Sequence, residues 1–312
     1  MTWVTWRQQR PEALIAALLF ALVLALLVPT GLHIASVYDA DGVAGCLGHP
    51  TGACGETISA FSGRWDTLVN LVAWFNLLPA LIGVLFAAPF VLEFEHGTFR
   101  LAWTQSVTRD RWLTVRLALI AAATAAVALL LTVAMTWWRH PLDSAGSRLQ
   151  DGFNFEGATP VAYALFATAL VIALGVVLRR TAAAIGLSLV AFVALRVAVE
   201  GWVRPHYLAA IHARWTGTHG PDLRGAWILS QLNGLRVGEA HGIPPAVAAS
   251  CVSGFKRLDS QCLARHGIVQ YASAVYQPAS RFWLFQGVEA GIFLALALAL
   301  GAFAVVWIRR RI

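Results

Sequence analysis

Six long apolar stretches, separated by polar connections, dominate the pattern of this chain. A bilayer core about 30 Å thick needs roughly 20 mostly apolar residues to be crossed by a helix. The stretches that meet this length are Ala13 to Ser36, Leu68 to Leu92, Leu113 to Trp137, Thr159 to Leu178, Thr181 to Val203 and Phe282 to Ile308. The pattern therefore predicts an all-α polytopic membrane protein, with six transmembrane helices in a single domain over residues 1–312.

The composition agrees with a membrane protein. Hydrophobic residues make up 58% of the chain and charged residues only 12%, with a mean hydropathy of +0.67, well above that of a soluble domain. The net charge is +7, but many arginines lie at span ends rather than in one groove, so we expect no nucleic-acid partner. Lys256 is the only lysine among the 23 basic residues. This bias, with the Ala-rich spans, indicates the plasma membrane of a high-GC bacterium.

Arginines mark one side of the predicted membrane. They gather before the first span, between spans two and three, between spans four and five, and after the sixth. These arginines are Arg7, Arg10, Arg100, Arg109, Arg111, Arg116, Arg179, Arg180, Arg309, Arg310 and Arg311. The positive-inside rule places these segments and both termini in the cytoplasm. The first apolar run is longer than the roughly 7–15 residues of a signal-peptide core, so we expect it to remain as a span.

All four cysteines fall in predicted outward segments. Cys46 and Cys54 lie in the first, and Cys251 and Cys262 lie in the last. Disulfides persist in oxidising compartments, so this placement predicts two local bridges, Cys46 with Cys54 and Cys251 with Cys262. Neither pair has C-x-x-C spacing or a set of partner histidines, so no metal site is predicted.

The polar connections predict further elements. Residues 1–12 (MTWVTWRQQRPE) combine tryptophans and arginines, a mixture typical of an interfacial helix or of a simple membrane anchor. The segments Val37 to Thr67 and Trp138 to Ala158 read as irregular connections. The outward segment 204–281 is different, because two stretches within it carry apolar residues at helical spacing between Gly and Pro breaks. These stretches are Leu223 to Leu235 and Ala246 to Leu263, and they predict a helical extracytoplasmic cap.

Ionisable residues inside spans cost about 2.5 to 3.5 kcal/mol each on insertion scales, so each needs a physical reason. Arg196 and Glu200 lie four residues apart on the fifth span and share a face. They can neutralise one another as a pair, or they can line a pathway or its outer gate. Both interpretations remain open.

Three more polar residues lie in predicted spans. Glu289 lies about two turns inside the sixth span, where its side chain can snorkel outward or meet Arg281. Asn70 and Asn76, on the second span, are expected to hydrogen-bond between helices, although substrate contact is the other interpretation.

The most informative polar stretch connects spans two and three, EFEHGTFRLAWTQSVTRDRWLTVRLA from Glu93 to Ala118. It is too polar to cross a lipid bilayer and too apolar to be fully solvated by water. Its run E-x-G-T-x-R-L, then T-x-S-V-T-R-x-x-W-L, then Arg116, resembles the coupling region of type-2 ATP-binding-cassette (ABC) exporter permeases, especially actinobacterial members. The stretch Tyr276 to Gln286 (YQPASRFWLFQ) is similar to the same group, and the resemblance covers essentially the whole chain.

The resemblance implies that residues 93–112 include a coupling helix that docks in a groove of a separate ATPase. The candidate ATPase-coupling residues are Glu93, Glu95, His96, Gly97, Thr98, Arg100, Thr104, Gln105, Ser106, Thr108, Arg109 and Arg111. Their chemistry is compatible with docking, since the Gly-Thr pair permits a sharp turn with a hydroxyl cap and exposed charges complement a partner. A solvated loop that only obeys the positive-inside rule is the alternative.

The chain shows no motif for chemistry of its own. It contains no G-x-x-x-x-G-K-[ST] run and no H-E-x-x-H run, and His96 beside Glu95 lacks a second metal ligand. We therefore expect a non-enzyme that binds no cofactor. The resemblance implies that ATP and Mg²⁺ bind to two copies of a cytosolic ABC ATPase subunit. It also implies a second permease subunit, most simply in a homodimer, surrounded by membrane lipid.

Two functions follow from these expectations. The first is export of a hydrophobic or amphipathic compound by alternating access, driven by the separate ATPase. The alternative is an ABC-partnered membrane scaffold or sensor, for signalling or for lipid or peptide extraction, without a substrate pathway across the membrane.

Overall fold

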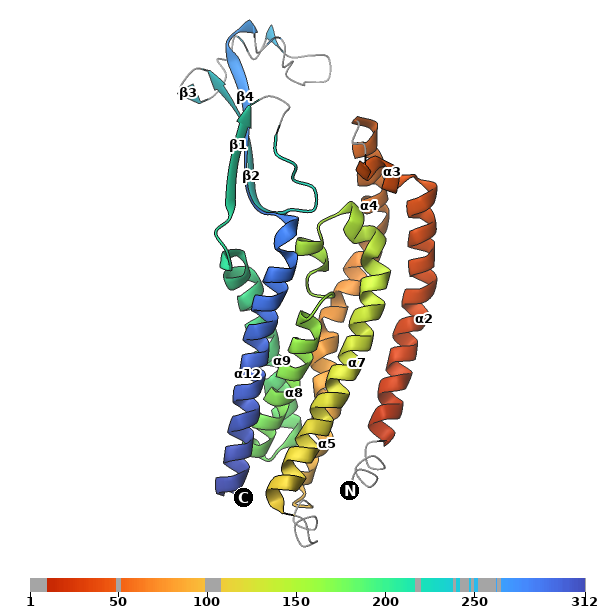
Figure 1. Ribbon diagram of the computed structural model, residues 1–312, viewed down its shortest axis with the longest axis vertical. Coiled ribbons are helices and arrows are strands. Elements are labelled where there is room, and N and C mark those ends of the chain that lie inside the picture. The colour runs from red at the N-terminus through yellow and green to blue at the C-terminus, as the bar shows by residue number, and fades with distance from the viewer. Residues whose placement is uncertain are drawn as a thin grey trace.

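The structure is a computed structural model that describes residues 10–48, 52–98, 108–216, 220–237, 240–241, 247, 250–251, 262 and 265–311. Among these residues, six helical segments are long and apolar enough to cross a membrane, as the sequence predicts. They form an elongated bundle (Figure 1). Its helices are α2 (Arg10–Ala40), α4 (Gly52–Val72) continued by the 3₁₀ turn η1 (Ala73–Leu77) and α5 (Leu78–Glu95), α7 (Arg109–Ala145), α8 (Thr159–Leu178), α9 (Thr181–Ala198) and α12 (Phe282–Arg311).

The start of α2 and the end of α12 lie at the same end of the bundle (Figure 1). The turn after α5 and the turn between α8 and α9 lie at that end too, and we call it the terminal end. The opposite end carries a β-sheet, and we call it the sheet end. This arrangement puts the arginine-rich connections of the chain on one side of the bundle.

The first connection is helical, and the prediction of an irregular Val37 to Thr67 segment is wrong. α2 continues to Ala40, the short helix α3 covers Val43–Gly48, and α4 begins at Gly52. Polar and glycine residues weaken a helix by only about 1 kcal/mol each, so packing overrides them. That packing comes from edge-to-face contacts of His33 with Trp65 and of Tyr38 with Phe61, which hold α2 against α4.

The second connection, predicted as irregular over Trp138 to Ala158, is also partly helical. α7 continues through Pro141 to Ala145, and a π-helical turn, η2, covers Arg148–Gly152. Only the residues around this turn and those leading to Thr159 are irregular.

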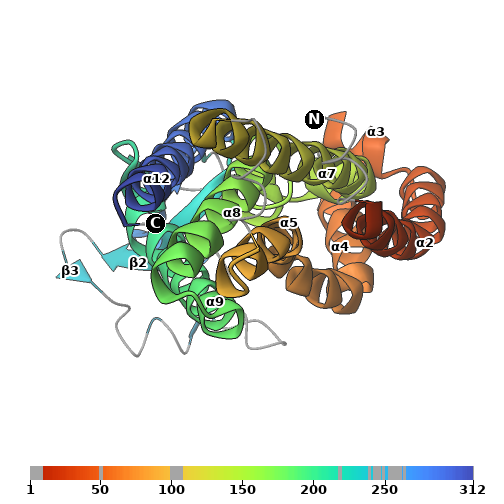
Figure 2. The same cartoon turned by 90° about the horizontal axis from the view of Figure 1, so that it is seen from below.

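Helix α8 occupies the centre of the bundle, between α5, α7, α9 and α12 (Figure 2). Two glycines let α5 and α8 approach closely, because small residues allow backbones to pack against each other. A Cβ at Gly83 would lie 2.7 Å from the Thr168 amide nitrogen, and one at Gly175 would lie 2.3 Å from Val91. The boundaries of α8, Thr159 and Leu178, are those predicted from the apolar run.

The segment between α9 and α12 contains a sheet, so the all-α fold class and the first predicted helix of the cap, Leu223 to Leu235, are wrong in this part. Its strands are β1 (Ile211–Thr216), β2 (Trp227–Val237), β3 (Ala240–His241) and β4 (Ile268–Gln277). They pair antiparallel in the order β1-β4-β2-β3. The sheet projects beyond the helices (Figure 1).

The apolar residues of Leu223 to Leu235 fit a helical period, but the long-range partner of this stretch decided its structure. Trp227 to Val237 pairs along most of its length with Ile268 to Gln277. β-Branched and aromatic residues favour strands once a partner covers them, and local periodicity does not reveal a partner so distant in sequence.

Three predicted elements lie largely outside the described residues. They are the interfacial helix over 1–12, the central part of the coupling region at 99–107, and the helix over Ala246 to Leu263. These elements stay predictions.

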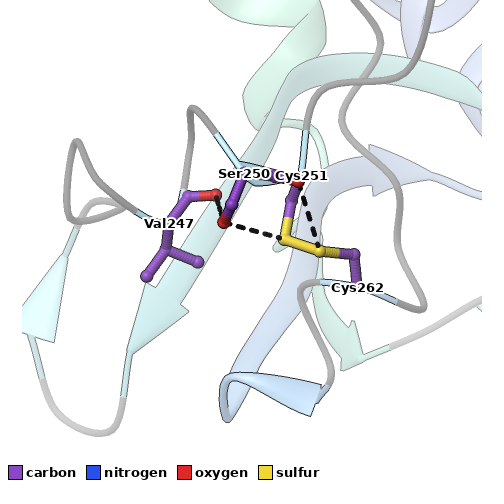
Figure 3. The surroundings of a disulfide bond; sticks show 4 residues. All are labelled: Val247, Ser250, Cys251 and Cys262. Carbon is purple, nitrogen blue, oxygen red and sulfur yellow. Dashed lines mark hydrogen bonds between the residues drawn. A yellow bond between two sulfur atoms is a disulfide. The ribbon is translucent and has the colours of Figure 1, made fainter.

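Both disulfides pair as the cysteine placement predicts. Cys46 in α3 bonds Cys54 in α4 with Cα atoms 5.1 Å apart, and Cys251 bonds Cys262 with Cα atoms 5.5 Å apart. Figure 3 shows the second bridge, beside Ser250, whose hydroxyl donates to the Val247 carbonyl at 3.0 Å. The His266 ring lies near the same sulfurs. Because both sulfurs are bonded to each other, they offer no thiolate to a metal ion.

We predict that digests made without reduction contain the Cys46–Cys54 and Cys251–Cys262 cross-linked peptides. Mass spectrometry of the purified protein measures this. Four free thiols, or a bridge between the two segments, would contradict the connectivity. The double variant Cys46→Ser/Cys54→Ser should lower the free energy of unfolding by roughly 2 to 4 kcal/mol, because the bridge restrains the unfolded chain.

Candidate functional site

The predicted coupling region begins with a sharp turn at the end of α5. His96 follows the last helical residue, and Gly97 has a φ of +71°, in the left-handed region that favours glycine. The Thr98 hydroxyl donates to the Glu93 carbonyl at 3.4 Å. The described chain stops at Thr98 and resumes at Thr108. The candidates between them, Arg100, Thr104, Gln105 and Ser106, lie outside the described residues.

An ion pair joins the two helices on either side of this region. Arg116 of α7 contacts Glu93 of α5, with Nη2 to Oε1 at 2.5 Å, and the Arg116 side chain is 7% exposed. A second, exposed ion pair joins Asp110 to Arg309 at 2.9 Å, between the first turn of α7 and the last turn of α12. The helix ends on both sides of the coupling region are therefore fixed to the bundle.

Arg109 and Arg111 lie exposed in the first turn of α7. Positive charges at a helix N-terminus are disfavoured by the helix dipole, by about 0.3 to 1 kcal/mol each. The N-cap residue, Thr108, makes no capping hydrogen bond with its side chain. Their charges therefore gain nothing from the dipole of α7, and membrane topology or a partner is a candidate reason for them.

Glu95, the last residue of α5, reaches the start of α9. Its Oε2 accepts a hydrogen bond from the Thr181 amide at 2.8 Å and another from the Thr181 hydroxyl at 2.5 Å. Of the predicted coupling residues, Glu93 and Glu95 therefore join α5 to two different helices, α7 and α9.

A buried polar cluster lies at the other side of the bundle, around Glu289 of α12. This carboxylate is 1% exposed. It accepts hydrogen bonds from Arg204 Nε and Nη2, both at 2.8 Å, from the Tyr207 hydroxyl at 3.0 Å, and from the Tyr163 hydroxyl. The predictions that Glu289 snorkels or meets Arg281 are wrong. Arg281 instead donates to the Ala209 carbonyl at 2.7 Å.

Arg196 extends this cluster to the second span. Its guanidinium donates to Asn76, at 2.8 Å to the carbonyl and 3.2 Å to the side-chain oxygen, and lies 4.4 Å from the centre of the Tyr163 ring. This is the interhelical hydrogen bond predicted for Asn76, whereas Asn70 lies exposed on α4. The predicted partner Glu200 is farther, at 4.0 Å, and is half exposed.

Glu200 lies closer to other groups than to Arg196. It is 3.8 Å from Arg204 and accepts hydrogen bonds from Asn154 at 3.3 Å. The structure thus brings Arg196, Glu200 and Glu289 together with Arg204 in a cluster of two positive and two negative groups. The charges of these four groups balance within the cluster, and a role in a pathway stays a hypothesis.

The depth of the cluster follows from helix geometry. Glu289 is about 28 Å along α12 from Ile308, at 1.5 Å per residue, close to the full thickness of a bilayer core. Trp74 and Trp202 are about 31 Å from Glu95 and Thr181 along their helices, and they are 73% and 77% exposed. Exposed tryptophans are typical of a membrane interface, so the polar cluster lies at the interface nearest the sheet.

Sequence reasoning missed Gln286, although a lone glutamine in an apolar span is a signal. Its Oε1 accepts the amides of Ala158 and Thr159 at 3.1 Å each, and its Nε2 donates to the Phe153 carbonyl at 2.8 Å. The N-cap Ala158 has no side chain able to cap α8. Gln286 therefore caps α8 from α12.

Sequence reasoning also missed a pair of carboxyl groups near the sheet end. Asp143 accepts two hydrogen bonds from Arg139, at 2.8 and 3.2 Å. Glu156 pairs with Arg148 and is 2% exposed. Burial, and then the neighbouring Asp143 carboxylate that shares a hydrogen bond with it, raise the pKa of Glu156 to about 7.

Comparison with known protein families finds a match over part of the chain. A family model described as ABC-2 membrane transporter related matches residues 17–204, more than half of the chain. The match covers the first five spans and the predicted coupling region, and it ends before the sheet. No curated protein and no solved structure matches. These comparisons give no support to an actinobacterial origin.

We predict that Arg204 and Glu289 depend on each other more strongly than Arg196 and Glu200 do. Replacing either member of the buried pair by alanine should lower the free energy of unfolding by about 3 to 5 kcal/mol, because an uncompensated charge remains buried. The double variant should lose less than the sum. Glu200→Ala should cost at most about 1 kcal/mol, since Glu200 is half exposed.

Thermal unfolding in detergent measures both double-mutant cycles. Additive losses at Arg204 and Glu289 would contradict the pairing. Equal coupling energies in the two cycles would contradict the ranking.

We predict a pH dependence that originates at Glu156. Its pKa is raised in the folded protein from 4.5 to about 7. Its contribution to stability is therefore fully present below pH 4.5 and is lost as the pH rises through 7. Glu156→Gln keeps the group neutral, so the unfolding temperature of this variant should fall less than that of the wild type between pH 5.5 and pH 8.

The matched control is Glu56→Gln, which removes an exposed carboxylate on α4. This control should keep the pH profile of the wild type. An unchanged profile in Glu156→Gln would show that another group titrates.

Proposed function

This chain belongs to the ABC-2 membrane transporter related family, and on that premise we propose that it is the transmembrane permease subunit of an ABC exporter. A separate ATPase subunit supplies the energy, and the cargo is a hydrophobic or amphipathic compound. The observation that carries the proposal is the attachment of the coupling region, whose two flanking helices are joined by the ion pair of Glu93 with the buried Arg116.

This attachment suits the transmission of force. A flexible loop between two spans would absorb the push of a partner before it reached the helices. Here the turn at Gly97 follows α5 directly, and Arg116 lies only two turns into α7. Displacement of residues 96–108 would therefore tilt α5 and α7 together.

The surface chemistry suits an acidic partner groove. Arg109 and Arg111 are exposed where they weaken their own helix, and rim charges of this kind steer and orient a docking partner. Arg179 and Arg180, and Arg309 to Arg311, lie at the same terminal end. By the positive-inside rule, this end is cytoplasmic in our proposal, and the sheet is outside.

The central position of α8 supports a pathway between subunits. Most of its side chains are buried, and the glycines at 83 and 175 bring it into close contact with α5. A channel through the middle of one subunit would have to displace this helix. We propose instead that a second copy of the permease supplies the other wall, and that two ATPase subunits bind to the dimer.

We predict that Arg109→Glu/Arg111→Glu weakens the binding of the partner ABC ATPase by about tenfold or more, because it reverses two steering charges. Gly97→Val should bind but uncouple hydrolysis from transport, because valine disfavours a positive φ. The control is Arg64→Glu, an exposed arginine near the sheet end that pairs with Asp41.

Co-purification and ATPase activity in reconstituted vesicles measure these effects. All variants should keep the unfolding temperature of the wild type within a few degrees. Wild-type binding and coupling in both coupling-region variants would reject the assignment. An ATPase that binds but never responds to co-purified small molecules would favour the scaffold or sensor.

A further inference from the structure

The start of α9 lacks a cap of its own. α8 ends at Leu178, Arg179 adopts a left-handed conformation with a φ of 51°, and Arg180 is the N-cap residue. The Arg180 side chain makes no capping hydrogen bond. The first amides of a helix have no partner within the helix, so the Thr181 amide needs an acceptor from elsewhere.

Glu95 is that acceptor, and it belongs to another span. One carboxylate oxygen receives both the amide and the hydroxyl of Thr181. A negative group at a helix N-terminus also interacts favourably with the helix dipole. The capping group of α9 is thus carried by the last residue of α5, next to the turn that opens the coupling region.

A second tie joins α9 to the turn that precedes α5, about 22 Å along α9 from Thr181 at 1.5 Å per residue. Arg196 of α9 donates to Asn76 of η1, which continues into α5. Between these ties α9 packs against α8, where Phe192 contacts the Tyr163 and Phe166 rings. The hydrogen bonds of Glu95 and Asn76 tie α9 to α5 and η1 in addition to this packing.

We propose that Glu95 is a positioning residue that makes α9 move with α5, so that displacement of residues 96–108 reaches the Arg204–Glu289 cluster. This inference rests on the proposed function. α9 leads without a break through the π-helical turn η3 (Val199–Val203) to Arg204, in the 3₁₀ turn η4 (Arg204–His206), and Arg204 binds Glu289 of α12. Glu93 has a different role, because it holds α7.

Two variants remove the tie from opposite sides. Glu95→Ala removes the acceptor. Thr181→Pro removes the amide hydrogen and the hydroxyl while preserving the helix, because proline is favoured at the first helical position. The preceding residue, Arg180, has a φ of −139° and a ψ of 107°, which is the extended conformation that a residue before proline requires.

Gln286→Ala is the matched control. It removes the cap that α12 provides to α8, which is buried whereas the Glu95 cap is exposed, and it lies far from the coupling region. If capping acts only through stability, the buried control should reduce the response at least as much as Glu95→Ala. If Glu95 transmits displacement, only the Glu95 and Thr181 variants should affect the response of the sheet end to nucleotide.

Hydrogen exchange of the permease–ATPase complex, with and without MgATP and vanadate, measures this response. In the wild type, nucleotide should change the exchange of residues 96–98 and 199–208. In Glu95→Ala and Thr181→Pro, the change at 96–98 should persist while that at 199–208 falls about threefold or more. Gln286→Ala should lower the unfolding temperature and keep both changes.

A full response at 199–208 in Thr181→Pro would overturn the inference, as would an equal loss in Gln286→Ala. If Glu95→Ala fails to fold, Thr181→Pro carries the test alone. Failure of the proposed function gives a different result, because then no ATPase binds the wild-type protein or nucleotide leaves residues 96–98 unchanged.

Discussion

A buried carboxylate determines how the sheet end of this protein is assembled. Glu289 lies inside the bundle near the membrane interface, and an isolated charge in such a place would cost several kcal/mol. The positive charge of Arg204 compensates the Glu289 carboxylate. Arg204 lies close to Glu289 because the chain leaves α9 through a π-helical turn and a 3₁₀ turn. These irregular turns fix the start of β1, and the same pairing fixes α12, which follows β4. The position of the sheet therefore depends on this ion pair together with the hydrogen bonds of Gln277 to the Pro205 and Leu208 carbonyls.

Sequence reasoning succeeded where a structure depends on local properties. The apolar run of α8 gave both of its boundaries, because apolar side chains surround this helix on all sides. The disulfides followed from cysteines close in sequence. It failed where the deciding partner is remote, as for Trp227 to Val237, whose strand partner comes after a long insertion. Glu289 shows the same limit, because the sequence offered Arg281 as a neighbour while the fold supplied Arg204.

The same distinction between local properties and remote partners applies to the candidate site residues. The turn at Gly97 and Thr98 could be predicted from residue type, and the structure has it. The partners of Glu93 and Glu95 could not be predicted from the sequence. Both carboxylates lie in one short polar run, and only in the folded protein does each contact a different helix. Arg116 could be noticed in the sequence as a charged residue within an apolar span, and Gln286 as a polar residue within another. For the exposed coupling residues the sequence offered only a resemblance to a known family. A surface that binds a partner protein has no internal packing that would reveal it.

The same helices connect the two ends of the bundle. At the terminal end, acidic residues at the end of α5 hold α7 and α9, and at the sheet end a neutral cluster of charges holds α8, α9 and α12. A push on the coupling region is useful to an exporter only if the helices carry it between these ends. The central claim is therefore that an ATPase binds at residues 96–108 and nowhere near the sheet.

Site-specific photocrosslinking tests this claim most directly. A photoreactive benzoylphenylalanine replaces Trp103, within the coupling region, or Trp202, which is exposed near the sheet. The complex with the partner ABC ATPase is then irradiated and separated on a denaturing gel. The account predicts a permease–ATPase adduct from position 103 and none from position 202. An adduct from position 202, or none from position 103 in a complex that co-purifies, would contradict it.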